Sequence, residues 1–279
     1  MKIAVLSGKG GTGKTLVSVN LASAFEEAIY IDCDVEEPNG HLFFKPDDVV
    51  EKEILVKTPV VDHDKCSGCR TCVEFCKFNA LAFINQKVKV FDSICHSCGG
   101  CSLICPEHAI KEKDKAIGVI ESGQSQNVKV ITGRLNTGEE TGVPIIKELL
   151  HLNREEVLNT VIDCPPGSSC MVMESIKDAD YCVLIAEPTL FGRHNLNMVY
   201  DLVKLFDKPF GCVLNKCIQG ENPSESFCVD ENIPIIGRIP FDKNLGAINS
   251  NGTIITRVSM AYDALFKAIL NRIEEEVSR

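Results

Sequence analysis

The chain has 279 residues, of which 44% are hydrophobic, so it is long enough for one large domain and a small one. Its net charge is -10 and it has no run of Lys and Arg, which argues against nucleic acid or an anionic membrane as partners. The N-terminal residues enter an apolar strand directly, without the regions of a signal peptide, so we expect a cytoplasmic protein.

The first predicted strand, residues 3–6, runs into a glycine-rich loop that is followed by a predicted helix over residues 16–26. The loop has the phosphate-binding pattern G-x-x-x-x-G-K followed by Thr. Its glycines let backbone N-H groups converge on phosphate oxygens at the positive end of a helix. Lys14 is expected to reach the β- and γ-phosphates, and the Thr15 hydroxyl to bind Mg²⁺. The complete loop comprises Gly8, Lys9, Gly10, Gly11, Thr12, Gly13, Lys14 and Thr15.

The same loop also fits a dinucleotide-binding pattern. Gly8, Gly10 and Gly13 spell G-x-G-x-x-G, and Asp32 ends the second predicted strand where such a fold places its ribose-binding acid. A dinucleotide loop has no use for a Lys-Thr pair after its last glycine, whereas a phosphate-binding loop of an NTPase needs both. The loop therefore favours a nucleoside triphosphate.

Acidic residues follow two further predicted strands. Asp32 and Asp34 come after the strand at residues 29–31, and Asp163 follows residues 161–162 and precedes Cys-Pro-Pro-Gly. We expect Asp163 to hold Mg²⁺ through water and the other two carboxylates to lie near the γ-phosphate. The alternative is that all three are solvated acids at strand ends.

Eight of the fifteen cysteines lie between Cys66 and Cys105, in two runs of C-x-x-C-x-x-C-x-x-x-C that start 29 residues apart. This is the spacing of bacterial ferredoxins with two [4Fe-4S] clusters, in which the fourth cysteine of each run binds the other cluster. Zinc is the competing metal, but a zinc site needs no triplet with a fourth cysteine at plus four. The predicted ligand sets are Cys66, Cys69, Cys72 and Cys105 for one cluster, and Cys95, Cys98, Cys101 and Cys76 for the second.

Beyond the cysteine runs, short apolar segments at residues 128–131, 182–185 and 212–214 alternate with helical patterns. The sequence thus predicts an α/β fold: a mostly parallel P-loop NTPase sheet covered by helices, with an inserted small α+β domain like a bacterial ferredoxin. The predicted segments are 1–57 for the first part of the ATPase domain, 58–118 for the insertion and 119–279 for the second part. Polar stretches at 139–142 and 193–195 are expected in loops.

Asn215 follows the strand at residues 212–214, where an ordinary turn at the end of a strand also fits. A guanine-specific site needs an Asp three residues later, and this chain has Ile218 there, so ATP is favoured over GTP. A second wall of the base site is expected at residues 239–242, although an ordinary turn between a strand and a helix fits as well.

Lys9 early in the loop, Asp32-Cys33-Asp34 and Asp163-Cys164-Pro165-Pro166-Gly167 together resemble the MinD superfamily, which includes partition ATPases, the nitrogenase iron protein and iron-sulfur carrier ATPases. The resemblance implies that Lys9 crosses a dimer interface to the partner's ATP, that Asp34 positions or activates the attacking water, and that Asp163 begins switch II. It also implies that Asn215 reads adenine, and that the chain forms a nucleotide-dependent homodimer or a heterodimer with a paralogue. Cys164 and Cys170, on the expected switch II, are core residues or cluster ligands across such a dimer.

Three functions remain open. The first is nucleotide-gated electron transfer by an ATP-hydrolysing protein with two [4Fe-4S] clusters and a redox partner. The second is an assembly or carrier ATPase that delivers clusters to an iron-sulfur client protein. The third is a MinD-like positioning ATPase in which the ferredoxin module is structural, but the last predicted helix, residues 257–277, ends too acidic for a membrane-targeting tail.

Overall fold

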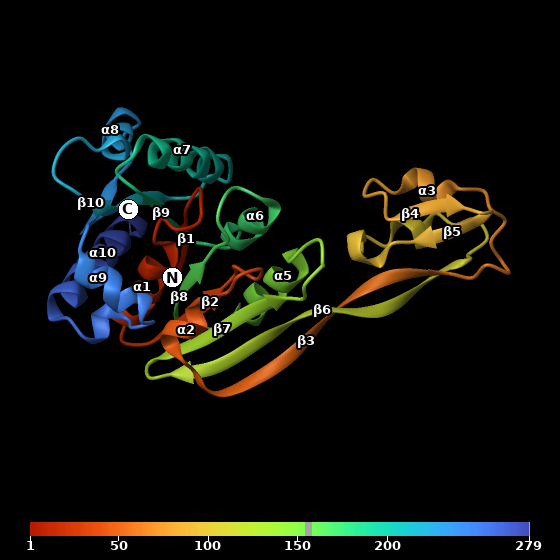
Figure 1. Ribbon diagram of the computed structural model, residues 1–279, viewed down its shortest axis with the longest axis horizontal. Helices are drawn as coiled ribbons and strands as arrows, with labels where there is room; N and C mark the ends of the chain where they lie inside the picture. Colours follow the sequence, from red (N-terminus) through yellow and green to blue (C-terminus); the bar gives the residue numbers. More distant parts are fainter. Residues whose placement is uncertain (154–157, 279) are drawn as a thin grey trace.

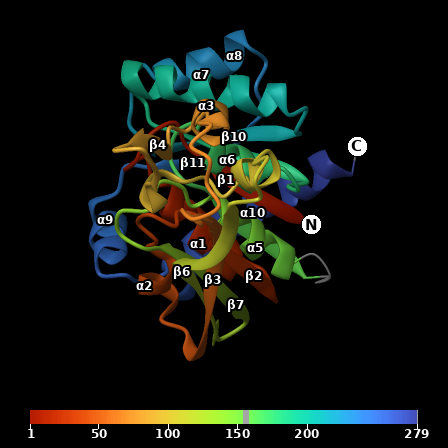
Figure 2. The ribbon, with the colours of Figure 1, turned by 90° about the vertical axis from the view of Figure 1, so that its right-hand side faces the viewer.

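The computed structural model describes residues 1–153 and 158–278. The predicted segment 119–279 also includes residues 154–157 and 279, which lie outside the described residues. Figure 1 shows an α/β body that contains both termini, and a small cysteine-bearing part at the end of a long two-stranded arm. Figure 2 looks along the arm, with the small part in front of the body. We refer to residues 62–109, which form this small part, as the cysteine module.

The body is built on one sheet of nine strands within the described residues, in the order β11-β10-β9-β1-β8-β2-β7-β6-β3. The strands from β11 to β7 are parallel, as predicted from the alternation of apolar runs with helices, while β6 and β3 are antiparallel. Their bounds are β1 Lys2–Leu6, β2 Ala28–Asp32, β3 Asp47–Val61, β6 Ile110–Ser125, β7 Val128–Leu135, β8 Asn159–Asp163, β9 Tyr181–Ala186, β10 Phe210–Cys217 and β11 Ile235–Pro240.

Helices bury both faces of this sheet. Successive side chains of a strand point to opposite faces, so Ala4 and Leu6 of β1 belong to one core and Ile3 and Val5 to the other. The first core is covered by α5 Val143–Leu152, α6 Cys170–Ile176, α7 Leu190–Leu205 and α8 Pro223–Asp230. The second is covered by α1 Lys14–Ala24, α2 Gly40–Phe44, α9 Lys243–Ser250, η2 Ile255–Arg257 and α10 Met260–Val277.

Three local predictions need correction. The first helix begins at Lys14 rather than at residue 16, because Gly13 takes a left-handed conformation directly before it. Residues 193–195 were expected in a loop but lie inside α7, which starts upstream where the Thr189 side chain accepts a hydrogen bond from Gly192 N. The last helix starts at Met260, after a separate turn of 3₁₀ helix.

The arm consists of β3 and β6, whose antiparallel pairing runs from Asp47 opposite Gln124 to Val61 opposite Ile110. Along β6, only the residues from Gly118 onward pair with β7. The remaining residues 110–117 of β6 therefore project beyond the carboxyl edge of the sheet by about 26 Å at ~3.3 Å per residue. The expected boundaries 57/58 and 118/119 fall inside these continuous strands, because the change in cysteine content begins only where the strands end.

The cysteine module contains α3 Thr71–Phe75, β4 Leu81–Ile84, β5 Lys87–Val90, η1 Asp92–Ile94 and α4 Gly100–Leu103. Its core is small: Cys72, Leu81, Val88 and Cys101 are buried together with Ile110 at the end of the arm, and seven partly buried hydrophobic side chains pack against them. Such a core alone supplies little stability, so a module of this size needs additional cross-links. None of the helices in the described part of the chain has the length and apolar composition needed to cross a bilayer.

Candidate nucleotide site and cysteine-lined cavities

The sheet order places β1 between β8 and β9, so the loop after β1 lies between Asp163 at the end of β8 and Glu187 after β9. Ligands of open α/β sheets bind at this carboxyl edge. A cleft of about 290 Å³ lies there. Its lining includes Lys9, Gly10, Gly11, Gly13, Lys14, Thr15, Asp34, Glu37, Asn39 and Pro166.

Glycine is required at the last turn of the loop. Gly13 has φ of 97°, a left-handed value, and a Cβ atom there would collide with the Asn215 side-chain amide. Asn215, which is 2% exposed, donates from Nδ2 to the Thr12 carbonyl oxygen at 2.7 Å. Asn215 therefore supports the loop from β10, and its contact with a base remains a prediction.

Lys14 and Asp163 form the central ion pair of the site. Lys14 Nζ lies 2.7 Å from Asp163 Oδ1 and 3.7 Å from Asp34 Oδ2, and the two side chains of the closer pair are 7% and 1% exposed. Burial disfavours the Lys14 ammonium, but the carboxylates of Asp163 and Asp34 outweigh burial and raise the pKa of Lys14. The sequence prediction that these three residues share one site agrees with this geometry.

Tyr30 on β2 is a site residue that the sequence analysis missed. Its hydroxyl donates to Asp163 Oδ2 at 2.9 Å, so Lys14 and Tyr30 occupy both carboxylate oxygens of Asp163. Tyr30 is fully buried, and burial together with the Asp163 charge raises the pKa of its phenol. In the sequence Tyr30 is indistinguishable from an apolar strand residue. Its position two residues before Asp32 is the one feature that could have indicated a contact with Asp163.

Asp32 and Asp34 have different surroundings. The Asp32 carboxylate is fully buried and accepts hydrogen bonds from the backbone N-H groups of Asp34, Asn39 and Gly40 at 3.1, 3.0 and 2.9 Å. These hydrogen bonds fix the loop after β2. Both oxygens of the Asp32 carboxylate are engaged by backbone N-H groups, and its contact with nucleotide stays a prediction. Burial and the neighbouring Asp163 raise the pKa of Asp32 to about 7.

The Asp34 carboxylate, in contrast, lines the cleft and is 19% exposed. Burial raises its pKa to about 6, Lys14 opposes the rise, and the carboxylates of Asp163, Glu37 and Glu36 add to it. A carboxylate with such a pKa is suited to accept or orient a proton near neutral pH.

Lys9 is held by a residue that the sequence analysis did not single out. Its Nζ lies 2.8 Å from Glu187 Oε2 and 5.0 Å from the centre of the Phe191 ring. Lys216 Nζ contacts Oε1 of the same carboxylate at 2.5 Å and also donates to the Gly11 carbonyl oxygen at 2.8 Å. Burial opposes ionisation of Glu187, but these two lysines lower its pKa.

A second cleft of about 240 Å³ continues from the loop toward Asn215. Gly11, Gly13, Leu16, Pro240 and Phe241 are among its lining residues. The expected turn between a strand and a helix is present, because Asp242 caps α9 by accepting from Asn244 N at 2.7 Å. Pro240, Phe241 and Asp242 line this cleft, and their contact with a base stays a prediction.

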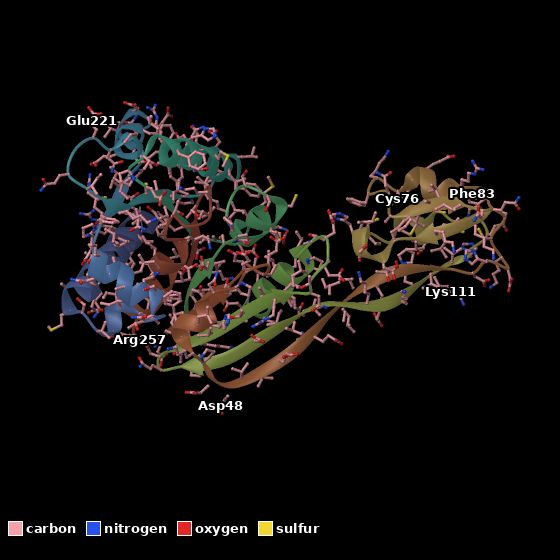
Figure 3. The ribbon with its side chains drawn as sticks, viewed as in Figure 1. Asp48, Cys76, Phe83, Lys111, Glu221 and Arg257 are labelled. Atoms are coloured by element: carbon pink, nitrogen blue, oxygen red, sulfur yellow. The ribbon has the colours of Figure 1, made fainter. Side chains whose placement is uncertain are left out.

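The eight cysteines of the module are distributed over two cavities. The proximal cavity, of about 200 Å³, is lined by Cys76, Cys95, Cys98 and Cys101, together with Lys57 and Glu112 of the arm. The distal cavity is narrow, about 10 Å³, and is lined by Cys66, Cys69, Cys72 and Cys105 together with Val61 and Ile110 at the end of the arm. In Figure 3, Cys76 lies on the side of the module that faces the body, whereas Phe83 and Lys111 lie farther out.

These two groups of cysteines are the two crossed sets expected from the spacing. Each cavity thus receives three thiols from one run and the last thiol from the other, which is the donor set that a [4Fe-4S] cluster takes. The described residues contain no group of three or more His, Cys, Asp or Glu side chains arranged to hold a single metal ion.

The backbone repeats together with the cysteines. Left-handed φ values occur at Gly68, Arg70 and Asn79 in the first run, and at Ser97, Gly99 and His108 in the second. Each pair of equivalent positions is 29 residues apart, the same offset as the cysteines. Left-handed residues within such loops turn backbone N-H groups inward to form concave anion sites of the kind that surround iron-sulfur clusters. The donor set and the backbone both fit the clusters that the spacing predicts.

Cys164 and Cys170 lie apart from this module. Cys164 is buried beneath the nucleotide site, next to Cys33 and Cys182, whereas Cys170 is exposed at the start of α6. Burial raises the pKa of the Cys164 thiol, and this residue packs as a small apolar side chain.

A parallel sheet with a phosphate-binding loop after β1, flanked by the Lys14-Asp163 pair, defines a P-loop ATPase. The sequence profile of the CobQ/CobB/MinD/ParA nucleotide binding domain matches residues 3–255, and the chain belongs to this family.

Relatives of known sequence and structure fit this assignment. An uncharacterized protein of Methanocaldococcus jannaschii is 29% identical over 279 residues, which cover 99% of this chain and 97% of the relative. The iron-sulfur cluster carrier protein of Pyrococcus horikoshii is 25% identical over 98% of this chain and 87% of its own length. The cell division ATPase MinD of Pyrococcus furiosus has a similar fold, with a TM-score of 0.61 and 20% identity over 98% of each chain.

Proposed function

We propose that this ATPase carries two [4Fe-4S] clusters in its cysteine module and that its nucleotide state controls electron transfer between these clusters and a redox partner. Bound clusters would supply one-electron carriers whose potentials respond to nearby charge, hydrogen bonds and solvent. The observation that carries the proposal is the division of eight cysteines into two complete crossed sets, each lining its own cavity.

The ligands of the two clusters follow from this division. Cys76, Cys95, Cys98 and Cys101 would hold the proximal cluster, and Cys66, Cys69, Cys72 and Cys105 the distal one. The Thr71 hydroxyl contacts Cys69 Sγ at 3.3 Å, and the Ala109 N-H contacts Cys105 Sγ at 3.3 Å. The hydrogen bond from Thr71 lowers the pKa of the Cys69 thiol and would favour its ligating form, while the Ala109 N-H would orient the Cys105 sulfur.

At the nucleotide site, ATP would exchange the partners of the ion pair. Lys14 would leave Asp163 for the β- and γ-phosphates, Thr15 would bind Mg²⁺, and Asp163 would become free to hold Mg²⁺ through water. Tyr30 would keep Asp163 oriented during this exchange, because its hydrogen bond uses the oxygen that Lys14 does not contact. Asp34 would then orient the attacking water from across the cleft.

Dimerisation is part of the proposal. Lys9 is paired with Glu187, and it would have to leave this carboxylate to reach ATP across an interface. Glu187 would keep Lys216 as a second partner, so its carboxylate would not be left unpaired when Lys9 leaves. The second chain would be another copy or a paralogue.

A carrier function is the second candidate, and the Pyrococcus horikoshii relative with that name favours it. A carrier must release its cluster, whereas complete sets of four cysteines favour retention. The decisive experiment is anaerobic purification followed by incubation with an apo-ferredoxin acceptor, with and without ATP. Electron transfer requires that about eight irons stay on this chain. Rapid ATP-dependent movement of iron and sulfide to the acceptor would instead establish the carrier.

A further inference from the structure

Lys115 of β6 joins the cysteine module to the ATPase body. Its Nζ donates to the Asp92 carbonyl oxygen at 2.9 Å and to Glu139 Oε2 at 2.7 Å. The Lys115 and Glu139 side chains are only 21% and 15% exposed. Because both ends of the contact are shielded, it is stronger than the usual surface ion pair.

The Asp92 end of this link belongs to the proximal cluster site. Asp92 begins η1, and its carbonyl oxygen also accepts from the Cys95 N-H at 3.4 Å. Cys95 lines the proximal cavity. Lys115 therefore holds the backbone segment that delivers Cys95, without touching a cysteine itself.

The Glu139 end belongs to residues 136–142, which we call the junction loop, between β7 and α5. The Asn136 N-H donates to the Ile117 carbonyl oxygen at 2.9 Å, so the junction loop is fixed to the arm next to Lys115. In Figure 1 the stretch before α5 reaches from the body toward the module.

The junction loop also contacts both segments that follow the nucleotide-site acids. The Leu135 N-H, just before the loop, donates to the Val35 carbonyl oxygen at 2.8 Å, and Val35 directly follows Asp34. Gly142 lies against the Val35 side chain, and a Cβ atom built there would be 3.2 Å from Met171 Sδ of α6. A side chain at residue 142 would collide with Val35, so the backbone of this loop is packed closely against Val35 and lies near Met171.

We propose that Lys115 is a positioning residue that couples the loop carrying Asp34 to the segment that carries Cys95. In this inference, which rests on the proposed function, the change at Asp34 and α6 on nucleotide binding passes through the junction loop and Glu139 to Lys115 and Asp92. The proximal site is thus the one that responds directly to nucleotide, and the distal site responds through it.

Lys113 provides a matched control on the same strand. Its Nζ lies 2.7 Å from Asp92 Oδ2, but the Lys113 side chain is 51% exposed and does not contact Glu139 in the described contacts. Lys113→Met therefore removes a lysine from the same aspartate while leaving the link to the junction loop in place.

The test compares the anaerobically purified wild type with K115M and K113M by amide hydrogen exchange, with ADP and with a non-hydrolysable ATP analogue. In the wild type, exchange of residues 92–98 should differ between the nucleotides. In K115M this difference should vanish, and basal exchange of the segment should rise about tenfold, while K113M should behave as wild type. A retained difference in K115M, or none in the wild type, overturns the coupling.

Iron content, cluster absorbance and ATP hydrolysis of each variant, measured on the same preparations, show whether the protein is intact. K115M should keep its iron and its basal hydrolysis, since Lys115 touches neither cysteine nor nucleotide loop in the described contacts. Failure of the proposed function would look different: cluster potentials of the wild type would not respond to nucleotide even though the exchange difference depended on Lys115.

Discussion

Lys14 Nζ lies 2.7 Å from Asp163 Oδ1, and both side chains are almost completely buried. A buried lysine without a partner is costly, and Asp163 compensates the Lys14 charge. We propose that ATP phosphates take over this role and thereby release Asp163, which leads directly to Cys164 and the turn before α6. In this proposal, nucleotide in the loop changes the position of the segment after β8, the expected switch II.

Tyr30→Phe tests whether Asp163 needs its second hydrogen bond. The substitution removes the bond to Asp163 Oδ2 and leaves the packing of the ring. We expect kcat for ATP hydrolysis to fall about tenfold, equivalent to ~1.4 kcal/mol, with KM nearly unchanged. Tyr181→Phe is the matched control, because the Tyr181 hydroxyl is buried and makes no hydrogen bond among the described residues. If the two variants have equal kcat and KM, the hydrogen bond from Tyr30 to Asp163 does not contribute to ATP hydrolysis.

Lys9 and Lys216 share the Glu187 carboxylate, but only Lys9 is predicted to act on a second chain. In Lys9→Ala we expect loss of ATP-dependent dimerisation in light scattering and a fall in hydrolysis of about a hundredfold or more. Lys216→Ala loses the same ion-pair partner and should still dimerise. If the chain stays monomeric with ATP when hydrolysis is blocked by Asp34→Ala, the dimer proposal fails.

The pH dependence of hydrolysis should reveal Asp34. Its raised pKa of about 6 means that the carboxyl is protonated below that pH, so kcat/KM should decline as the pH falls from about 7 to about 5. Replacing Glu36 and Glu37 with Gln removes two carboxylates that raise this pKa, so the acid limb should move to lower pH. Protonation of the substrate is the same for the wild type and the variant, so it cannot cause a difference between them. If the acid limb of kcat/KM stays at the same pH in the variant, the titrating group is not Asp34.

Pairs of cysteine substitutions distinguish crossed from uncrossed ligation. If the sets are crossed, Cys66→Ser with Cys105→Ser damages one cluster and leaves about four irons per chain, while Cys66→Ser with Cys76→Ser damages both. Uncrossed ligation predicts the opposite result for the two double variants. Iron and sulfide analysis with electron paramagnetic resonance of the reduced proteins gives the answer directly.

The sequence predicted the parallel sheet and the loop because each depends on local patterns: apolar runs with fixed spacing, and glycines before Lys14. It missed Tyr30 and Glu187, since a buried tyrosine and a glutamate after β9 acquire their roles only when distant strands meet at one edge. Asp32 shows the reverse case, because its position after β2 suggested a ligand while the fold turns its carboxylate toward backbone N-H groups.

The cysteine runs specified how the thiols are grouped but not where the module lies. Strands β3 and β6 are half-exposed and rich in charged residues. Their apolar and polar residues alternate too irregularly to predict two paired strands of this length. Their pairing places the proximal cavity on the carboxyl-edge side of the sheet, the same side as the nucleotide cleft. Only the long-range register of the arm reveals that Lys115 bridges the two parts.

The proposed control of the clusters by nucleotide can be measured through the reduction potentials of the two proposed clusters, taken anaerobically with ADP and with a non-hydrolysable ATP analogue. With the ATP analogue we expect the potential of the cluster proposed at Cys76, Cys95, Cys98 and Cys101 to differ by ~30 mV or more from its value with ADP, since charge and hydrogen bonds near the sulfurs set the potential. Identical potentials and identical electron-transfer rates in both nucleotide states would contradict it.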